Sequence, residues 1–331
     1  MIDMRSFRIL RRVLAGAAVL LVLAVVADKA TAQSYPSKPI RMIVPFAPGG
    51  ADIVARLVAD RMSASLGQPV IVDNRPGAGG TTGTRATGLA DPDGYTLTLA
   101  SPGQMTVAPA VRKNLEYDPV RDFAPVALIA VSPFVLAINP KLPVRSVQEL
   151  VAYAKANPGK INFASPGGGT TSQLFGELLK QYSGIDIVHV PYRGSAPAIV
   201  DLVAGQVHMY FDNLRNIQPF ARDGRLRALA VTTESRAAET PELPTMIESG
   251  LAGFSGFYWN GVLAPSRTPA GIVERLNAVL NENLKSTEMR QTITKLGMEP
   301  KGGTPRDFAA LIEAEIKKWT AVAKAAKVTI E

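Results

Sequence analysis

The sequence predicts an α/β fold with mainly parallel sheets and two hydrophobic cores. Strand-like and helix-like patterns alternate along most of the chain, which is typical of α/β layers. The chain has 331 residues, of which 47% are hydrophobic and 19% charged, so it is globular and long enough for two cores. Several apolar strands also run directly into glycine-rich loops that open amphipathic helices.

The first 32 residues have the organisation of a signal peptide. A basic start with four arginines precedes an apolar stretch over 13–26 and a small-residue cleavage site, Ala30-Thr31-Ala32. The apolar stretch is shorter than the ~20 residues that a membrane-spanning helix needs. We therefore expect export by the general or the twin-arginine route, with cleavage near Ala32/Gln33.

Composition excludes several kinds of site. The chain has no cysteine, which excludes disulfides, thiolate metal sites, thiol nucleophiles and a lipid anchor on cysteine. Residues 1–32 hold five Lys/Arg and two Asp/Glu, so the mature chain keeps 31 basic and 26 acidic residues, a net charge of +5. This mild positive charge favours the approach of anions. The basic residues are scattered, and we expect no nucleic-acid partner.

The stretch Ile40 to Arg61 is the clearest strand-loop-helix unit. An apolar strand is followed by a loop with Pro48, Gly49 and Gly50, and then by a helix over 52–66. Such a loop brings the free N–H groups of the helix start to the carboxyl end of the strand. There they can bind an anion without any charged side chain.

A second glycine-rich loop, Asn74 to Thr84, also precedes a helix. Gly77 and Gly79 suggest a dinucleotide fingerprint, but the position of the third required glycine holds Thr82. We therefore expect no nucleotide here, and no cofactor elsewhere in the chain.

The apolar runs 125–131 and 134–139 are joined only by Ser132-Pro133. Two adjacent strands interrupt the strand-helix alternation, and we interpret them as the crossing into a second domain. The expected division places 33–132 and 254–331 in domain 1 and 133–253 in domain 2.

Domain 2 is expected to repeat the strand-loop-helix unit three times. Its loops are Ser165–Ser172, Pro191–Ala198 and Asp212-Asn213, each after a strand and before a helix. Because ligands of open α/β sheets bind at the carboxyl edge, these loops should form one site. The later helices, at 269–285, 288–296 and 305–326, are expected to cover the sheets without any chemical role.

The sequence argues against an enzyme. His189 and His208 are the only histidines and form no HExxH pair, and neither a G-x-S-x-G elbow nor an S-x-x-K motif is present. The remaining enzymatic alternative is a pair of carboxylates, Asp52 and Asp212, assembled in space for acid-base catalysis.

Many motifs along the mature chain resemble one family, the Bug or TctC-like solute-binding proteins of tripartite tricarboxylate transporters. The motifs are YPSKPIRMIVPFAPGG (35–50), LGQPVIVDNRPGAGG (66–80), PDGYTL (92–97), YDPVRDFAPV (117–126), HVPYRGSAPA (189–198), LRALAVTT (226–233) and EIKKW (315–319). The resemblance implies a two-domain, type II-like periplasmic binding fold whose interdomain cleft closes on a small carboxylate held by backbone amides. The ligand would be a di- or tricarboxylate, an aromatic acid or an acidic amino acid.

The resemblance also implies a periplasmic location, a monomeric state and a membrane permease that receives the ligand. A receptor that passes ligand occupancy to a signalling system needs the same closing cleft and stays open as an alternative.

Residues matching the family's ligand loops come from both domains. From domain 1 they are Phe46, Ala47, Gly49, Gly50, Ala51, Asp52, Ala78, Gly79 and Gly80, and from domain 2 they are Ser165, Gly169, Thr170, Thr171, Tyr192 and Asp212. Asp52 could instead serve only the helix start, and Tyr192 could be an ordinary core or hinge aromatic. Asp212 would repel a carboxylate, so it should meet an amine, a hydroxyl or a water.

The chain departs from the family pattern in two places. Only Ala51 separates Gly50 from Asp52, where the family commonly has two residues, so the first loop is expected to be shorter. Gln173 stands where the family often has histidine, which affects either ligand choice or helix packing.

Overall fold

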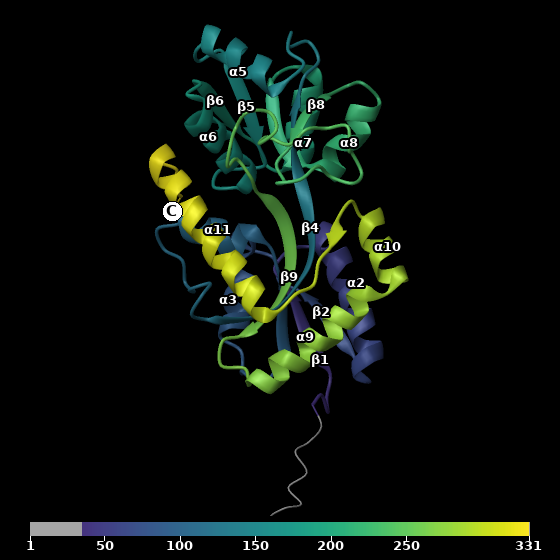
Figure 1. Ribbon diagram of the computed structural model, residues 1–331. Coiled ribbons are helices and arrows are strands. Elements are labelled where there is room, and N and C mark those ends of the chain that lie inside the picture. The colour runs from purple at the N-terminus through teal and green to yellow at the C-terminus, as the bar shows by residue number, and fades with distance from the viewer. Residues whose placement is uncertain (1–34, 331) are drawn as a thin grey trace, which may run out of the picture. The chain divides into compact units, whose positions relative to one another are not determined.

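The computed structural model describes residues 35–330 (Figure 1), so the expected signal peptide lies outside the described residues. The chain divides into two units, Met1–Lys38 and Pro39–Glu331. Residues 35–38 of the first unit contain no helix or strand, and every helix and strand of residues 35–330 belongs to the second unit. No helix within 35–330 combines the length and the apolar character that crossing a membrane requires.

The second unit is built on one mixed sheet. Its main path runs in the order β2 (Val70–Asn74), β1 (Ile40–Val44), β3 (Thr96–Ala100), β9 (Phe257–Pro265), β4 (Phe123–Ile138), β7 (Met209–Asn213), β5 (Ile161–Ser165) and β6 (Ile187–Pro191). Strands β8 (Arg227–Val231) and β10 (Glu299–Pro300) pair with β4 off this path. The pairs of β1 with β2 and β3, and of β5 with β6 and β7, are parallel, as the alternating pattern predicts.

Strand β4 joins two sections of this sheet. Its residues 123–133 pair with β9, and its residues 134–138 pair with β7 and β8, all antiparallel. The expectation of two strands broken at Ser132-Pro133 was therefore wrong, because Pro133 lies where the pairing passes from β9 to β7. We call β2-β1-β3-β9 with the first part of β4 the first section, and β7, β5, β6 and β8 with its last part the second section.

Helices flank both sections. They are α2 (Gly50–Leu66), α3 (Thr81–Gly88), α4 (Ala108–Val111), α5 (Val147–Ala156), α6 (Thr171–Ser183), α7 (Ser195–Ala204), α8 (Leu214–Arg222), α9 (Ala270–Lys285), α10 (Thr287–Lys295) and α11 (Pro305–Ala326). After β3, a π turn at Gly103–Val107 leads directly into α4. A 3-10 turn, Ala78–Gly80, precedes α3.

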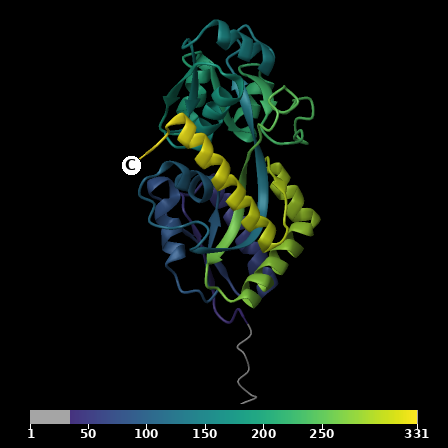
Figure 2. The same cartoon turned by 60° about the vertical axis from the view of Figure 1, so that its left-hand side comes forward.

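Helix α11 belongs to the core of both sections, which the sequence did not predict. Phe308 and Ile312, near its start, pack with Trp259 of β9, whereas Trp319 and Val322 pack in the cluster of Phe175 and other second-section residues. In Figures 1 and 2 the helix, in yellow, accordingly runs along both sections. Besides β4, it is a second element that contacts both sections.

A buried carboxyl group lies midway along α11. Glu315 is 4% exposed, and its Oε2 accepts hydrogen bonds from Trp259 Nε1 at 2.8 Å and from Thr106 Oγ1 at 3.2 Å. Burial raises the pKa of this carboxyl group. Trp259 is thus a core residue with a satisfied indole N–H, in keeping with the usual environment of a buried tryptophan.

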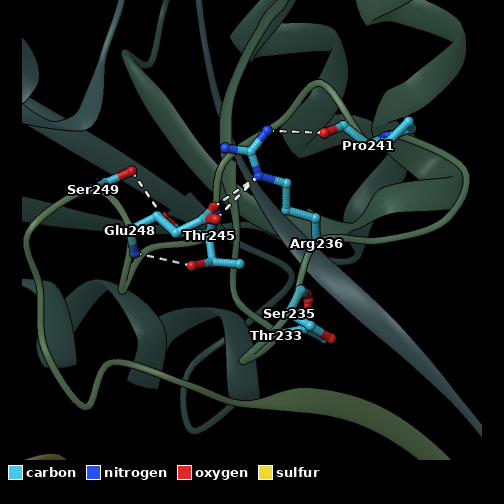
Figure 3. A network of polar contacts seen from close by, with 7 residues as sticks. All are labelled: Thr233, Ser235, Arg236, Pro241, Thr245, Glu248 and Ser249. Carbon is cyan, nitrogen blue, oxygen red and sulfur yellow. Dashed lines mark hydrogen bonds and ion pairs between the residues drawn. The ribbon is translucent and has the colours of Figure 1, made fainter.

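The long connection between β8 and β9 is fixed by a polar network (Figure 3). Arg236 Nε pairs with Glu248 Oε2 at 2.9 Å, and its Nη1 donates to the Pro241 carbonyl at 3.0 Å. Glu248 Oε2 and Thr245 Oγ1 each accept the other residue's backbone N–H. These bonds order a loop that has no strand or long helix of its own.

Gly176 offers a test of how α6 packs on β5. A Cβ added at this helix position would overlap the ring of Phe163 in β5, whereas one added at exposed Gly271 of α9 would meet nothing within 4 Å. We expect Gly176→Ala to lower the free energy of unfolding by about 1–3 kcal/mol, since overpacking outweighs the ~1 kcal/mol gain in helix propensity. Gly271→Ala should be neutral or stabilising. Urea unfolding of both variants is the measurement, and equal effects would contradict this packing.

Candidate ligand-binding cleft

A cavity of about 510 Å³ is bordered by loops of both sheet sections. Its lining consists of Phe46, Ala47, Ala51, Gly79, Thr81, Ser101, Gly103, Ala108, Val111, Arg112, Phe134, Pro166, Gly168, Gly169, Thr170, Thr171, Ser172, Ser195, Asp212, Asn213, Tyr258 and Ile330. Most of these residues follow the carboxyl ends of parallel strands, the edge at which α/β sheets bind ligands.

Five helices begin at this cavity after a loop or a strand end. The four-residue α4, whose first residue Ala108 also lines the cavity, instead continues the π turn Gly103–Val107, and the Ala108 N–H donates to the Gly103 carbonyl. Thr81 is the first residue of α3, Thr171 of α6 and Ser195 of α7, while Ala51 is the second residue of α2 and Asn213 immediately precedes α8. The N–H groups of a helix's first turn have no partner inside the helix. The cavity therefore gathers backbone donors from five separate helix starts.

None of these five helix starts has a side-chain cap. Three helices that begin away from the cavity do have one: Ser146, Ser286 and Thr304 accept the backbone N–H of the third helical residue of α5, α10 and α11 at 3.1–3.2 Å. Helix α9, which follows Pro269, is uncapped as well. Side-chain caps are thus absent from the five helix starts at the cavity and present at three of the four other helices of nine or more residues.

The residues before the five helices explain the missing caps. Gly49, Gly80 and Gly194 have no side chain, and the hydroxyl of Thr170 instead donates to the Gly167 carbonyl at 2.8 Å. Asn213 Oδ1 is buried and has no partner within the described part of the chain. The first-turn amides are therefore left to a ligand or to water.

Two of the residues that line the cavity are charged, Arg112 and Asp212. Asp212 is 2% exposed, and its two oxygens accept from Asn213 N at 2.8 Å and from Asn216 Nδ2 at 3.3 Å. Burial raises the pKa of Asp212 to about 6, against the opposing effect of these hydrogen bonds. The cavity is thus mainly neutral, with one cation and one strongly buried acid.

A second cavity of similar size, about 570 Å³, is a weaker candidate. It is lined along the side of one helix, α8, and by the segment 224–243, with Arg222, Arg227, Glu239 and Glu242 among its residues. It gathers neither several helix starts nor several strand ends. No group of acidic residues and histidines in residues 35–330 could hold a metal ion.

Eight of the sequence-predicted site residues line the first cavity: Phe46, Ala47, Ala51, Gly79, Gly169, Thr170, Thr171 and Asp212. Seven do not line it: Gly49, Gly50, Asp52, Ala78, Gly80, Ser165 and Tyr192. The side chains of three of these seven are engaged elsewhere.

Ser165 and Tyr192 hold their own loops. The Ser165 hydroxyl is bonded to the Gly167 carbonyl at 2.7 Å and to His189 Nε2 at 2.6 Å, so it shapes the loop from inside. Tyr192 donates its hydroxyl to Asp201 Oδ2 of α7 at 2.8 Å. Both residues support the loops that carry lining residues.

Asp52 lies in the first turn of α2, because this helix begins at Gly50 rather than at Asp52 as expected. Its Oδ2 is 3.0 Å from Arg56 Nε, and this hydrogen bond lowers the pKa of the carboxyl group. Arg56 also reaches Asn74, whose amide donates to the Phe46 carbonyl at 3.0 Å. Asp52 thus helps to fix the loop of Phe46, and the structure does not assemble it with Asp212 at the cavity.

In the second glycine-rich loop, a glycine lets the backbone pack closely against the first loop. Gly80 has a φ of +95°, and a Cβ there would come within 3.1 Å of the Phe46 ring.

In the third loop, Gly169 N donates to Gln173 Oε1 at 2.7 Å, so this amide is already used inside the protein. The glutamine that departs from the family pattern therefore fixes the third loop. The backbone donors at the start of α6 are those of residues 171–173.

The residues missed by sequence reasoning are of two kinds. Thr81 and Ser195 are the first residues of α3 and α7, and Ser172 is the second residue of α6. The loops before these helices were identified, so the rule on helix starts could have found all three residues. Arg112, Phe134, Tyr258 and Ile330 come from segments without a loop signal and reach the cavity through the sheet crossings and the last residues of the chain. No local sequence pattern marks them.

Comparisons with known proteins identify the family. Residues 54–328 match the family model TctC, described as "Tripartite tricarboxylate transporter family receptor". The chain belongs to the TctC family. The match spans nearly the whole folded part of the chain, so the α/β periplasmic binding protein fold and the family inferred from the motifs are both confirmed.

Solved structures of relatives agree with this TctC-family assignment. The periplasmic binding protein BugD is 36% identical, with a TM-score of 0.74 over 90% of this chain and 100% of its own. Rpa4515 of R. palustris with adipate is 38% identical, with a TM-score of 0.78 over 89% and 99%. MatC from Rhodopseudomonas palustris with bound malate is 35% identical, with a TM-score of 0.73 over 87% and 99%.

The family assignment settles the class of protein. TctC proteins are periplasmic binding proteins that act as transport receptors, so this TctC protein is not an enzyme. The catalytic alternative based on Asp52 and Asp212 is thereby overturned.

The raised pKa of Asp212 predicts how stability depends on pH. The raised pKa means that the folded protein holds the proton of Asp212 more tightly than the unfolded chain does. The stabilisation that this gives the fold is complete below the ordinary pKa of 3.8 and is lost as the pH rises through about 6. Between pH 5 and pH 8 the loss is about 1–2 kcal/mol. We expect Asp212→Asn to lack this loss.

Urea unfolding of the wild type and of Asp212→Asn at both pH values measures the difference. Parallel pH profiles for the two proteins would contradict the assignment, whatever the absolute stability of the variant.

Proposed function

We propose that this TctC protein captures a small organic acid in the cleft of Thr171, Ser195 and Asp212 and delivers it to the permease of a tripartite tricarboxylate transporter. The ligand is a di- or tricarboxylate, an aromatic acid or an acidic amino acid. Its carboxylate accepts hydrogen bonds from backbone amides at helix starts. Residues 1–32 act as the signal peptide that sends the chain to the periplasm.

The convergence of uncapped helix starts on one cavity carries this proposal. Each start offers several N–H groups and the positive end of a helix dipole, both of which favour an anion. The hydroxyl of Thr171 lies at one of these starts and adds a further donor. The Thr81 hydroxyl donates to the Ala78 carbonyl at 3.0 Å, and the Ser195 hydroxyl accepts from Tyr210 at 3.0 Å. Such a site suits a carboxylate better than a cation or an uncharged sugar.

The energetics are adequate for a transport receptor. Hydrogen bonds to a charged group contribute on the order of 1.5–3 kcal/mol each, and a helix dipole about 0.3–1 kcal/mol per terminus. Two or three such bonds would support micromolar binding after the costs of ordering the complex. The relatives Rpa4515 with adipate and MatC with bound malate, at 38% and 35% identity, support an acid as the ligand.

Closure of the cleft is part of the proposal. We assign 33–132 and 254–331 to one domain and 133–253 to the other, which places the crossing at residues 132–133 of β4 and before β9. Rotation of the second section about these strands would expel water from the cleft and strengthen its hydrogen bonds. We propose that a monomer carries out this cycle, because residues of both sheet sections of the same chain line the cavity.

A role as ligand sensor is the second candidate. It uses the same cleft and differs only in the partner that reads the closed form. Loss of uptake of the bound acid in cells lacking the permease subunits distinguishes transport from signalling.

The amide of Thr171 gives the sharpest test of the site. Thr171→Pro removes the N–H at the first position of α6, where proline fits the helix, and Thr170 before it is already extended with φ −99° and ψ 159°. Because a hydrogen bond to a charged ligand is lost, we expect affinity for the tightest-binding acid of a carboxylate panel to fall about 10- to 100-fold. Isothermal titration calorimetry measures the change.

Two control variants accompany this substitution. Thr171→Ala removes the hydroxyl and keeps the amide, so it should lose less affinity than Thr171→Pro. Thr287→Pro makes the same change at the first residue of α10, which is exposed and lies outside the cavity, and should leave binding unchanged. Equal affinities for wild type and Thr171→Pro would contradict the amide-based site.

A further inference from the structure

We propose that Arg112 determines ligand specificity by binding a second anionic group of the ligand, so that the cleft prefers acids with two negative charges to matched acids with one. This inference rests on the proposed function and concerns the same cleft. Nothing in the loop motifs indicates it, because Arg112 lies outside every glycine-rich loop.

The backbone of Arg112 is fixed on both sides. Its own N–H donates to Ala108 O at 2.9 Å, which ends α4. The residue then pairs in parallel with Ile330: Ile330 N donates to Val111 O at 2.8 Å, and Lys113 N donates to Ile330 O at 3.3 Å. This pairing with residue 330 sets where the Arg112 side chain starts, at the border of the cleft.

The guanidinium of Arg112 extends to the second glycine-rich loop. Its Nη2 donates to the Ala78 carbonyl at 3.1 Å and lies 3.7 Å from the position of a Cβ on Gly79. Gly79 lines the cavity, as does Thr81, which opens α3 three residues beyond Ala78. The cation therefore stands next to an uncapped helix start, and both attract the same kind of ligand group.

Most of the donors of Arg112 are not used by the protein. A guanidinium has five N–H donors, and the bond to Ala78 occupies one of them. Within the described chain no carboxylate lies within 4 Å of it: the nearby acid Glu116 pairs with Arg85 at 3.4 Å. Arg112 is thus half-buried at the cleft, and no residue within 35–330 supplies it with a counter-ion. Its planar fork matches a carboxylate.

The other charge at the cleft does not satisfy Arg112. Asp212 accepts two hydrogen bonds from Asn213 and Asn216 and makes no ion pair with Arg112. A ligand with a carboxylate at each end would therefore have two distinct places for its charges, the uncapped helix starts and Arg112. A monocarboxylate of the same length would leave one of them empty.

A purely structural role for Arg112 is the competing explanation. The bond to Ala78 could serve only to hold the loop of Gly79, in which case its loss would weaken the binding of all acids alike. General attraction of anions by a surface cation would also act on all acids, and would be shared by the neighbouring Lys113. Both explanations therefore predict equal weakening of diacid and monoacid binding, whereas a specificity role predicts weakening of diacid binding.

The experiment compares matched pairs of acids on wild type, Arg112→Gln and Lys113→Gln. The pairs are adipate with hexanoate, glutarate with valerate and succinate with butyrate, and calorimetry gives the dissociation constants. Wild type should bind the diacid of a pair more tightly. Arg112→Gln should weaken diacid binding about 10- to 100-fold and monoacid binding less than about threefold, because a charge-assisted bidentate contact is removed.

Lys113→Gln removes an adjacent exposed charge outside the cleft lining and should change neither. Arg112→Lys, which keeps the charge but not the fork, should fall between Arg112→Gln and wild type. Melting temperatures without ligand verify that each variant is folded.

The other possible outcomes distinguish failure of the role of Arg112 from failure of the proposed function. Equal binding of diacids and monoacids by wild type, or equal weakening of both by Arg112→Gln, would overturn the role of Arg112 and leave the proposed capture of acids intact. Failure of wild type to bind any acid of either kind would overturn both.

Discussion

Unpaired backbone amides at helix starts are the constraint on which the cleft depends. Every α-helix leaves its first N–H groups without an internal partner, and a buried helix start must satisfy them with a side chain, water or a ligand. In this chain Ser146, Ser286 and Thr304 satisfy them at α5, α10 and α11. At the cleft, glycines occupy three of the five capping positions, and the donors are left for a ligand. An anion is the natural complement of such a site.

The sheet and α11 bring these helix starts together. Strand β4 runs through both sections, so the carboxyl ends of the parallel strands β1, β2 and β3 and of the parallel strands β5, β6 and β7 border one cavity. Helix α11 packs with Trp259 near its start and with Phe175 near its end, and Glu315 is buried between these two contacts. Polar side chains that do not line the cleft, such as Ser165, Tyr192 and Asp52, hold the loops that do.

The alternation of strands and helices predicted the fold class, and the motifs predicted the family, because both can be recognised from short stretches of sequence. Glycine-rich turns before helices are also visible in sequence, and they identified the loop residues 46–52, 78–80 and 165–171. Local patterns did not reveal that Gly169 donates its amide to Gln173, that Ser132-Pro133 continues a strand, or that Ile330 borders the cleft. Those features depend on which distant segments meet, and sequence spacing contains no information on that.

The most direct measurement is a titration of ¹⁵N-labelled protein, followed by amide NMR shifts, with a tightly binding acid and with its uncharged amide analogue. We expect the acid to produce its largest shifts at the starts of the five helices, with Thr171, Ser172 and Ser195 among them, and the analogue to produce small shifts. Largest shifts beside α8 at 222–243, or equal shifts from both compounds, would contradict a carboxylate held by helix-start amides.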